Sequence, residues 1–292
     1  MSDGDGFGGH GRPGDGFRTV AVAGLGLIGG SLARDLAARG VRVLGYDADR
    51  STLEAALGSG VVAAALGEGW GGVEDADALV VAVPVRAAAA MLRDARPRLA
   101  GVRLITDAGS TKAAIVAEAG RLGIGARFVG AHPLAGGTRS GWAAARAGLF
   151  EGATVYLTPS AESSPEAVDL ARSLWASVGG RAVEMTADEH DRLLAWTSHL
   201  PQVVASAVGA ALAERGIAPG QLGPGGHGVT RLAASSPDVW RDILADNAAN
   251  VTTALAAVER HLAAARAAIE SGDVAAIRAW LEVGRDWGTP GS

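Results

Sequence analysis

The chain has 292 residues, of which 48% are hydrophobic and 20% are charged, a balance typical of globular rather than disordered proteins. At roughly 150 residues per domain, this length predicts about two domains. The net charge of −5 argues against nucleic-acid binding, and no apolar run is long enough to span a bilayer. The absence of cysteine excludes disulfides, thiolate metal sites and cysteine nucleophiles. Because the N-terminus lacks the features of a signal peptide, we expect a soluble cytoplasmic protein.

The N-terminal part of the chain has the pattern of an α/β domain. Residues 1–17 are rich in Gly and Asp and are expected to form a disordered tail. From Arg18 onward, short apolar runs typical of buried strands alternate with stretches of helical spacing. This alternation predicts a doubly wound parallel sheet, a Rossmann-type domain over residues 18–186. The expected strands lie at residues 18–24, 41–47, 78–84, 102–109, 126–132, 153–159 and 181–185.

The alternation stops after Met185, and no later segment has a strand pattern. Residues 187–292 are therefore predicted to form an all-helical domain. A capping box and a serine–proline pair mark the starts of two long helices. The first of these should kink just after His199, because Pro201 cannot continue the helical hydrogen bonds. The expected helices cover residues 186 onward through the kink, 236 to about 269, and roughly 273–284.

A glycine-rich loop joins the first expected strand to the first helix. In the pattern GxGxxG, Gly24 permits a tight turn, Gly26 lets a pyrophosphate approach, and Gly29 lets helix and strand pack closely. Asp47 ends the second strand, where an acidic side chain binds a ribose and repels a 2′-phosphate, so we predict NAD. Arg50 keeps NADP open, and a glycine turn that binds nothing is the structural alternative. The expected cofactor-binding residues are Gly24, Gly26, Leu27, Ile28, Gly29, Asp47, Arg50, Val83, Pro84 and Ser110.

Two polar motifs follow at the carboxyl ends of later strands, where doubly wound sheets bind ligands. The first, TDAGSTK at residues 106–112, has a plain alternative: Ser110 or Thr111 caps a helix while Lys112 is solvated. The second, GAHPLAG, contains His132, which is well placed beside a cofactor loop to act as a general base. Its plain alternative is a loop histidine that is hydrogen-bonded to backbone.

Taken together, the motifs identify a family. GLGLIGGSLA, DAGSTK, GAHPLAGGTRSGW, TSHLPQ and GVTRLAASSPDVWRDI occur in this order, and the set is far more specific than the glycine loop alone. From about Val20 to Glu259 the chain resembles the prephenate/arogenate dehydrogenase family of tyrosine biosynthesis. The resemblance implies NAD-dependent oxidative decarboxylation of prephenate to 4-hydroxyphenylpyruvate, without a metal. It also implies a homodimer formed through the helical domain, against the alternative that these helices pack only within a monomer.

The resemblance implies roles for individual residues. His132 falls on the catalytic histidine, which bonds the substrate's ring hydroxyl, and Ser110 on the serine that orients this hydroxyl. Arg231 falls on the arginine that binds a substrate carboxylate, a role that suits its planar guanidinium. Since only neutral His132 accepts a proton, activity should rise through about pH 6–7. The expected substrate-binding residues are Arg231, His199, Gly136, Thr138 and Gln202.

The chain departs from many relatives in the part of the pocket that meets the substrate side chain. Acidic residues are missing both from the loop after HPLAG and from residues 227–229, and Gln202 stands where histidine is frequent. Arogenate's ammonium would lack acidic partners, whereas His227 or Arg139 would favour the anionic pyruvyl group of prephenate. Prephenate is therefore the predicted substrate, with arogenate and 4-amino-4-deoxyprephenate as alternatives. Because the sequence ends at Ser292, soon after its last expected helix, we expect neither a fused chorismate mutase nor a regulatory ACT domain.

Two other classes of protein compete with this interpretation. A β-hydroxyacid or 6-phosphogluconate-type dehydrogenase would need a catalytic lysine in the second domain, but no lysine follows Lys112. A non-catalytic NAD-binding sensor would be expected to have lost catalytic positions, which are intact here. His190, His227 and His261 have no assigned role and are expected to be surface or packing residues.

Overall fold

The structure is a computed structural model that describes residues 16–137 and 139–289, and its contacts fall into two units. The first unit comprises the described residues up to Asp191 together with Ser235–Asp246. The second comprises Arg192–Ala234 and the described residues from Asn247 onward. The predicted tail lies almost entirely outside the described residues, but Phe17 is buried in the core. The predicted domain boundary between residues 186 and 187 stays a prediction.

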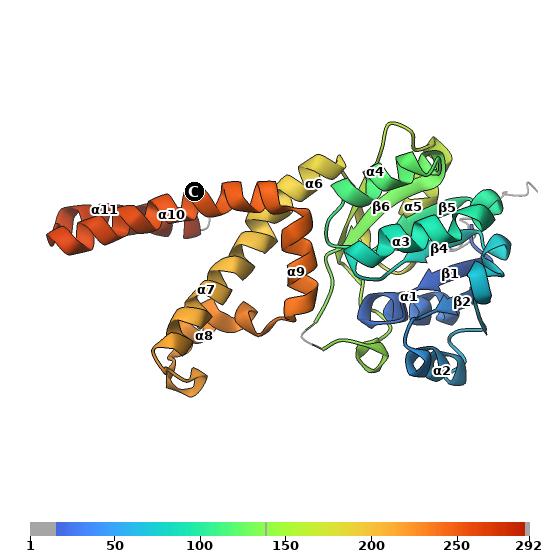
Figure 1. Ribbon diagram of the computed structural model, residues 1–292, viewed down its shortest axis with the longest axis horizontal. Helices are drawn as coiled ribbons and strands as arrows, with labels where there is room; N and C mark the ends of the chain where they lie inside the picture. Colours follow the sequence, from blue (N-terminus) through green and yellow to red (C-terminus); the bar gives the residue numbers. More distant parts are fainter. Residues whose placement is uncertain (1–15, 138, 290–292) are drawn as a thin grey trace, which may run out of the picture. The chain divides into compact units, whose positions relative to one another are not determined.

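The first unit is built on an eight-stranded sheet with the order β3-β2-β1-β4-β5-β6-β7-β8 (Figure 1). From β1 the chain adds β2 and β3 on one side and then β4 and β5 on the other, so the strand order reverses between β1 and β4. The carboxyl ends of these two strands form the switch point where such sheets bind ligands. The strands are β1 (Thr19–Ala23), β2 (Arg42–Tyr46), β3 (Ala64–Ala65), β4 (Ala78–Val81), β5 (Leu104–Asp107), β6 (Phe128–Pro133), β7 (Thr154–Pro159) and β8 (Arg181–Glu184).

The sheet is parallel except between β6 and β7, which pair antiparallel. A parallel pair needs a long crossover, usually a helix. Between these two strands the described residues contain only one short helical turn, Trp142–Ala144. The chain therefore returns alongside β6 in the opposite direction. The predicted doubly wound α/β fold is confirmed, and the expectation of an entirely parallel sheet is corrected here.

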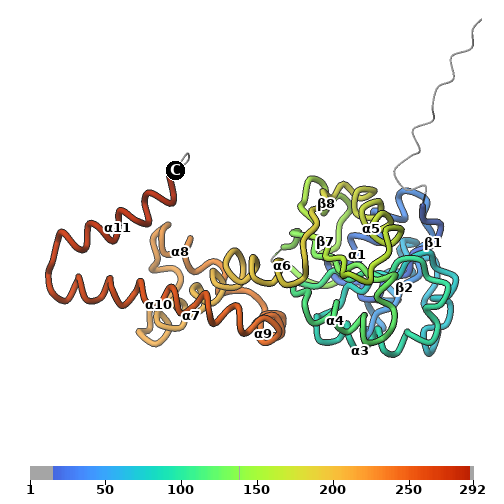
Figure 2. Tube along the Cα trace, turned by 90° about the horizontal axis from the view of Figure 1, so that it is seen from above, coloured from blue at the N-terminus to red at the C-terminus, as the bar shows by residue number. Residues whose placement is uncertain are grey.

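Helices cover both faces of this sheet. Alternate residues of β1 point to opposite faces: Val20 and Val22 pack with α1, α2 and α5, whereas Ala21 and Ala23 pack with α3 and α4. Figure 2 shows α5 on the side of the sheet opposite α3 and α4. The helices are α1 (Leu27–Ala38), α2 (Arg50–Gly58), α3 (Val85–Ala95), α4 (Ala113–Arg121) and α5 (Pro165–Ser177). Such a sheet, buried on both faces, explains the continuous apolar runs in the sequence.

The second unit is helical, as predicted. A π-helical turn at Ala195–His199 precedes Pro201, which lies in the first turn of α7 where its missing N–H is tolerated. At the predicted kink the chain therefore forms one π-helical turn and continues directly into α7, so the helix is not interrupted. The remaining helices are α6 (Ala187–Leu194), which crosses the unit boundary, and α7 (Leu200–Glu214), α8 (Pro224–Thr230), α10 (Ala248–Ser271) and α11 (Val274–Gly288).

The single helix expected from residue 236 to about 269 is divided in two. Helix α9 (Pro237–Asp246) belongs to the first unit, where Ile243 is buried, and α10 belongs to the second. Asn247, at the break, has non-helical backbone angles and a side chain hydrogen-bonded to Asn250. Side-chain bonding of this kind competes with the helical backbone. None of the helices in the described part of the chain is both long enough and apolar enough to cross a membrane.

Candidate functional site

The glycine loop between β1 and α1 is built so tightly that two of its glycines admit no side chain. Gly24 has φ +91°, and a Cβ there would lie 2.4 Å from the carbonyl oxygen of Ala82. A Cβ on Gly29 would lie 1.9 Å from the carbonyl oxygen of Gly24. These contacts give the tight turn and the close packing that the fingerprint predicts.

Gly26 differs, because a Cβ built on it meets nothing within 4 Å. It is the N-cap of α1, so the open space lies where the first backbone N–H groups of the helix are exposed. An open, side-chain-free helix N-terminus suits a pyrophosphate, both through its N–H donors and through the helix dipole. The loop therefore fits a dinucleotide.

A cavity in the first unit opens beside this loop. Six of the predicted cofactor-binding residues line it: Gly26, Leu27, Ile28, Val83, Pro84 and Ser110. The structure adds residues for which the sequence offered no signal, among them Gly109, Ser140, Gly141, Val239, Asp242 and Ile243. The last three come from α9, which belongs to the first unit.

Asp47 and Arg50 follow β2 and have different surroundings. The Asp47 carboxylate accepts hydrogen bonds from the backbone N–H of Leu25 at 2.7 Å and of Asp49 at 2.9 Å. It therefore ties the glycine loop to the end of β2, where an acid is expected for a ribose. Arg50 forms an exposed ion pair with Glu54, with Nε and Oε1 2.8 Å apart. A contact between Arg50 and a cofactor stays a prediction.

The open space at Gly26 leads to a direct test. We expect Gly26→Ala to fold normally but to raise the dissociation constant of NADH at least about tenfold, a cost of roughly 1.4 kcal/mol, because the new methyl group fills the phosphate cradle. Gly58→Ala is the matched control, since Gly58 ends α2 and also has open space around its Cβ position. Titration calorimetry measures both affinities. Unchanged NADH binding by Gly26→Ala would place the cofactor elsewhere.

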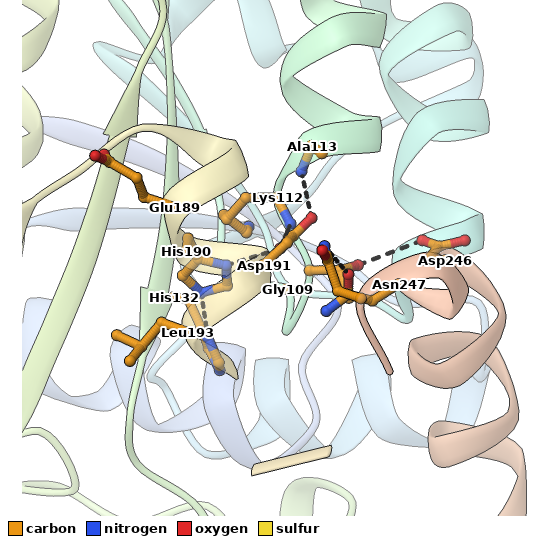
Figure 3. Close-up of polar contacts among 12 residues, drawn as sticks. Gly109, Lys112, Ala113, His132, Glu189, His190, Asp191, Leu193, Asp246 and Asn247 are labelled. Carbon is orange, nitrogen blue, oxygen red and sulfur yellow. Dashed lines mark hydrogen bonds and ion pairs between the residues drawn. The ribbon is translucent and has the colours of Figure 1, made fainter. Parts of the chain in front are cut away.

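The predicted general base, His132, lies in β6 and is hydrogen-bonded to a second histidine. Its Nδ1 is 2.8 Å from Nε2 of His190, and Nδ1 of His190 is 2.8 Å from Oδ1 of Asp191 (Figure 3). His190 is completely buried, and both its ring nitrogens are hydrogen-bonded. Of the two expectations for His190, a surface position is therefore wrong, whereas a buried, packed position is confirmed. The only sequence signal was the run Glu-His-Asp in the first turn of a helix.

Asp191 connects this row of side chains to the motif that contains Ser110. Its Oδ1 and Oδ2 accept hydrogen bonds from the backbone N–H of Lys112 at 2.8 Å and of Ala113 at 2.9 Å, at the start of α4. Burial alone would raise the pKa of Asp191, but hydrogen bonds from His190 and from these two N–H groups hold its pKa below the usual value. Asp191 is therefore an anion at neutral pH.

The alternative in which a serine or threonine caps α4 is wrong. The N-cap is Lys112, and no side chain caps the helix there; the carboxylate of Asp191 satisfies the first N–H groups instead. The Thr111 hydroxyl donates to Oδ2 of Asp246 at 3.3 Å. Ser110 lines the cavity beside the glycine loop.

Lys112, the single lysine of the chain, is completely buried rather than solvated. Its ammonium forms an ion pair with Asp107, at the end of β5, and donates to the carbonyl of Ala131 at 2.8 Å. Asp107 also accepts hydrogen bonds from the backbone N–H of Gly109 and Ala131. Burial lowers the pKa of Lys112, an effect that the charges of Asp107 and Asp191 oppose. This network fixes the ends of β5 and β6 that present Ser110 and His132.

Of the predicted substrate-binding residues, His199, Gln202 and Arg231 belong to the second unit, and Gly136 belongs to the first. Buried His199 lies in the π-helical turn, with its Nδ1 3.1 Å from Nδ2 of Asn247. Gln202 is buried and donates to the carbonyl of Leu232 at 2.8 Å. Exposed Arg231 lines a cavity of the second unit together with His227. Gly136 is exposed in the first unit, and Thr138 lies outside the described residues.

Comparisons with known proteins identify the family of this chain. The family model described as "Prephenate dehydrogenase, nucleotide-binding domain" matches residues 32–184, and "Prephenate dehydrogenase, dimerization domain" matches residues 186–283. A prephenate dehydrogenase of Bacillus subtilis is 38% identical over 237 residues, which are 78% of this chain and 64% of that enzyme. This chain thus spans less than two thirds of that relative's length.

Two further relatives match over most of their length. A cyclohexadienyl dehydrogenase of Zymomonas mobilis is 33% identical over 88% of this chain and 90% of its own. The crystal structure of prephenate dehydrogenase from A. aeolicus, in complex with hydroxyphenyl propionate and NAD+, superimposes with a TM-score of 0.80 at 29% identity. That match covers 92% of this chain and 96% of the other. With both domain models matched in order along the chain, it belongs to the prephenate dehydrogenase family.

Proposed function

We propose that the chain catalyses NAD-dependent oxidative decarboxylation of prephenate to 4-hydroxyphenylpyruvate and CO2. The observation that carries the proposal is the position of His132. It lies at the carboxyl end of β6, on the edge of the sheet that also carries the glycine loop and Ser110, and its Nδ1 is held by a buried partner. A histidine oriented in this way beside a dinucleotide loop suits proton transfer to or from a substrate hydroxyl.

Each proposed residue has a limited task in this reaction. NAD, when bound, supplies the two-electron acceptor, and the loop at Gly26 with Asp47 holds it. His132 takes up the ring-hydroxyl proton as the carbon bearing that hydroxyl is oxidised, with Ser110 orienting the hydroxyl. Loss of the substrate carboxylate as CO2 makes the ring aromatic, and the proton returns to the resulting phenol. Since aromatisation drives the reaction, positioning and one base suffice.

We propose that Arg231 binds a substrate carboxylate, because its guanidinium presents two parallel donors to the two oxygens. His199, Gln202, Gly136 and Thr138 are proposed to complete the substrate pocket. Prephenate is favoured over arogenate because the described residues beside Gly136 include the cationic Arg139 and no acid for an ammonium group. An alternative substrate is arogenate, since the Zymomonas mobilis relative is named for the broader class of cyclohexadienyl compounds.

The test is NADH formation from NAD, with prephenate and arogenate offered in parallel. We expect turnover of prephenate with at least about tenfold higher kcat/KM than with arogenate, roughly 1.4 kcal/mol of discrimination. A preference for arogenate would overturn the assignment of the pocket and keep the chemistry. NADH binding without turnover of either compound, or of the 4-amino analogue, would favour a sensor and contradict the proposed function.

We also propose that the second unit forms a homodimer. Its two C-terminal helices expose large apolar side chains that a monomer leaves in water, including Leu262, Ile269, Leu281 and Trp287. The family model that matches residues 186–283 is described as a dimerization domain. Packing against a second copy of the chain would remove these apolar side chains from water. The cytoplasmic location stays a prediction.

A further inference from the structure

His132, His190 and Asp191 form a continuous row, which Figure 3 shows as side chains linked end to end. Both links are 2.8 Å long and join ring nitrogens to each other and to a carboxylate. His190 is fully buried and Asp191 is 3% exposed, so water has little access to compete for these bonds. The ring of His190 also packs edge to face against Tyr156, with centroids 5.6 Å apart. The row is therefore held in one geometry.

The direction of each hydrogen bond follows from Asp191. Both of its carboxylate oxygens accept backbone N–H groups at the start of α4, so Asp191 acts only as an acceptor. Nδ1 of His190 must then carry a hydrogen and donate it. In a neutral imidazole the other nitrogen is an acceptor, so Nε2 of His190 accepts, and Nδ1 of His132 must be the donor.

We propose that His190 and Asp191 are positioning residues that hold His132 in the Nδ1–H tautomer, with the lone pair of its Nε2 directed to the proton that is transferred. This inference rests on the proposed function and names residues for which the sequence had assigned no role. A carboxylate that orients a catalytic histidine is the logic of the serine-protease triad, where the wrong tautomer costs about 10⁴ in kcat. Here a second imidazole stands between the carboxylate and the base.

The arrangement couples the hydrogen positions on the two imidazole rings. A proton added to His190 turns its Nε2 into a donor, which forces Nδ1 of His132 to accept and moves the hydrogen of His132 to Nε2. That form cannot act as a base, so the tautomer of His132 depends on which nitrogen of His190 carries the hydrogen.

Two substitutions of His190 test its role in orienting His132. His190→Leu removes both bonds, and we expect kcat for prephenate to fall about 10²-fold while KM and NADH affinity change less than about threefold. His190→Gln keeps an oxygen that can accept from His132 but cannot be protonated, so most of kcat should return. His261→Gln, on the exposed surface of α10, is the control for a histidine outside the row.

The tautomer itself can be measured without turnover, from the ring ¹⁵N shifts of His132 assigned by comparison with His132→Asn. We expect the Nδ1–H tautomer at neutral pH in the wild-type chain and its loss in His190→Leu. An Nε2–H tautomer, or a kcat unchanged in His190→Leu, would overturn the proposal. Because the shifts do not depend on substrate, a chain that turns over neither substrate yet shows the Nδ1–H tautomer would contradict the proposed function and leave the positioning row standing.

Discussion

Replacing Lys112 by methionine is expected to lower the free energy of unfolding by about 3–5 kcal/mol, the usual cost of removing one partner of a buried ion pair. Methionine has a similar volume, so the loss reports charge rather than packing. Asp107 would remain buried, with two backbone N–H groups but without its cation. Urea unfolding followed by circular dichroism gives the free energy for both proteins.

Two controls define that result. The double variant Lys112→Met with Asp107→Asn removes both charges and keeps an acceptor for the backbone of Gly109 and Ala131, so it should recover a large part of the loss. Arg50→Met, in an exposed ion pair, should change stability by less than about 0.5 kcal/mol. If Lys112→Met were as stable as the wild-type chain, the buried ion pair would be contradicted and the alternative of a solvated Lys112 supported.

His132→Asn is expected to lower kcat for prephenate by about 10²–10⁴-fold, the range that a positioned general base contributes. The asparagine amide can still meet His190, but it has no basic nitrogen at the position of Nε2. NADH affinity should stay within about threefold, because His132 is not among the residues that line the cavity beside the glycine loop. Steady-state rates and calorimetric titration with NADH check the two parts separately.

The result would be read against His261→Asn, which changes an exposed histidine of α10 in the same way. If both variants kept wild-type rates, His132 would not be the base, and another group would have to take the hydroxyl proton. If His132→Asn lost NADH binding as well as rate, its effect would be on the fold of β6 or on the cofactor site rather than on proton transfer.

Local sequence patterns determined much of this molecule. The glycine loop, the apolar strands and the position of His132 at the end of a strand were all predicted, because steric limits on glycine and the burial of a two-faced sheet act within a few residues. Order along the chain then placed Ser110 and His132 at the same edge of the sheet. The resemblance to the family rested on these same segments.

Contacts between distant segments decided the rest. His190 lies 58 residues from His132 and Asp191 lies 79 residues from Lys112, so no local pattern could show that they meet. The single lysine reads as a solvated residue until β5, β6 and α6 enclose it and Asp107 balances its charge. Sequence alone thus indicated which residue could act as the base. Only the tertiary structure, through burial and long-range hydrogen bonds, decided what orients it.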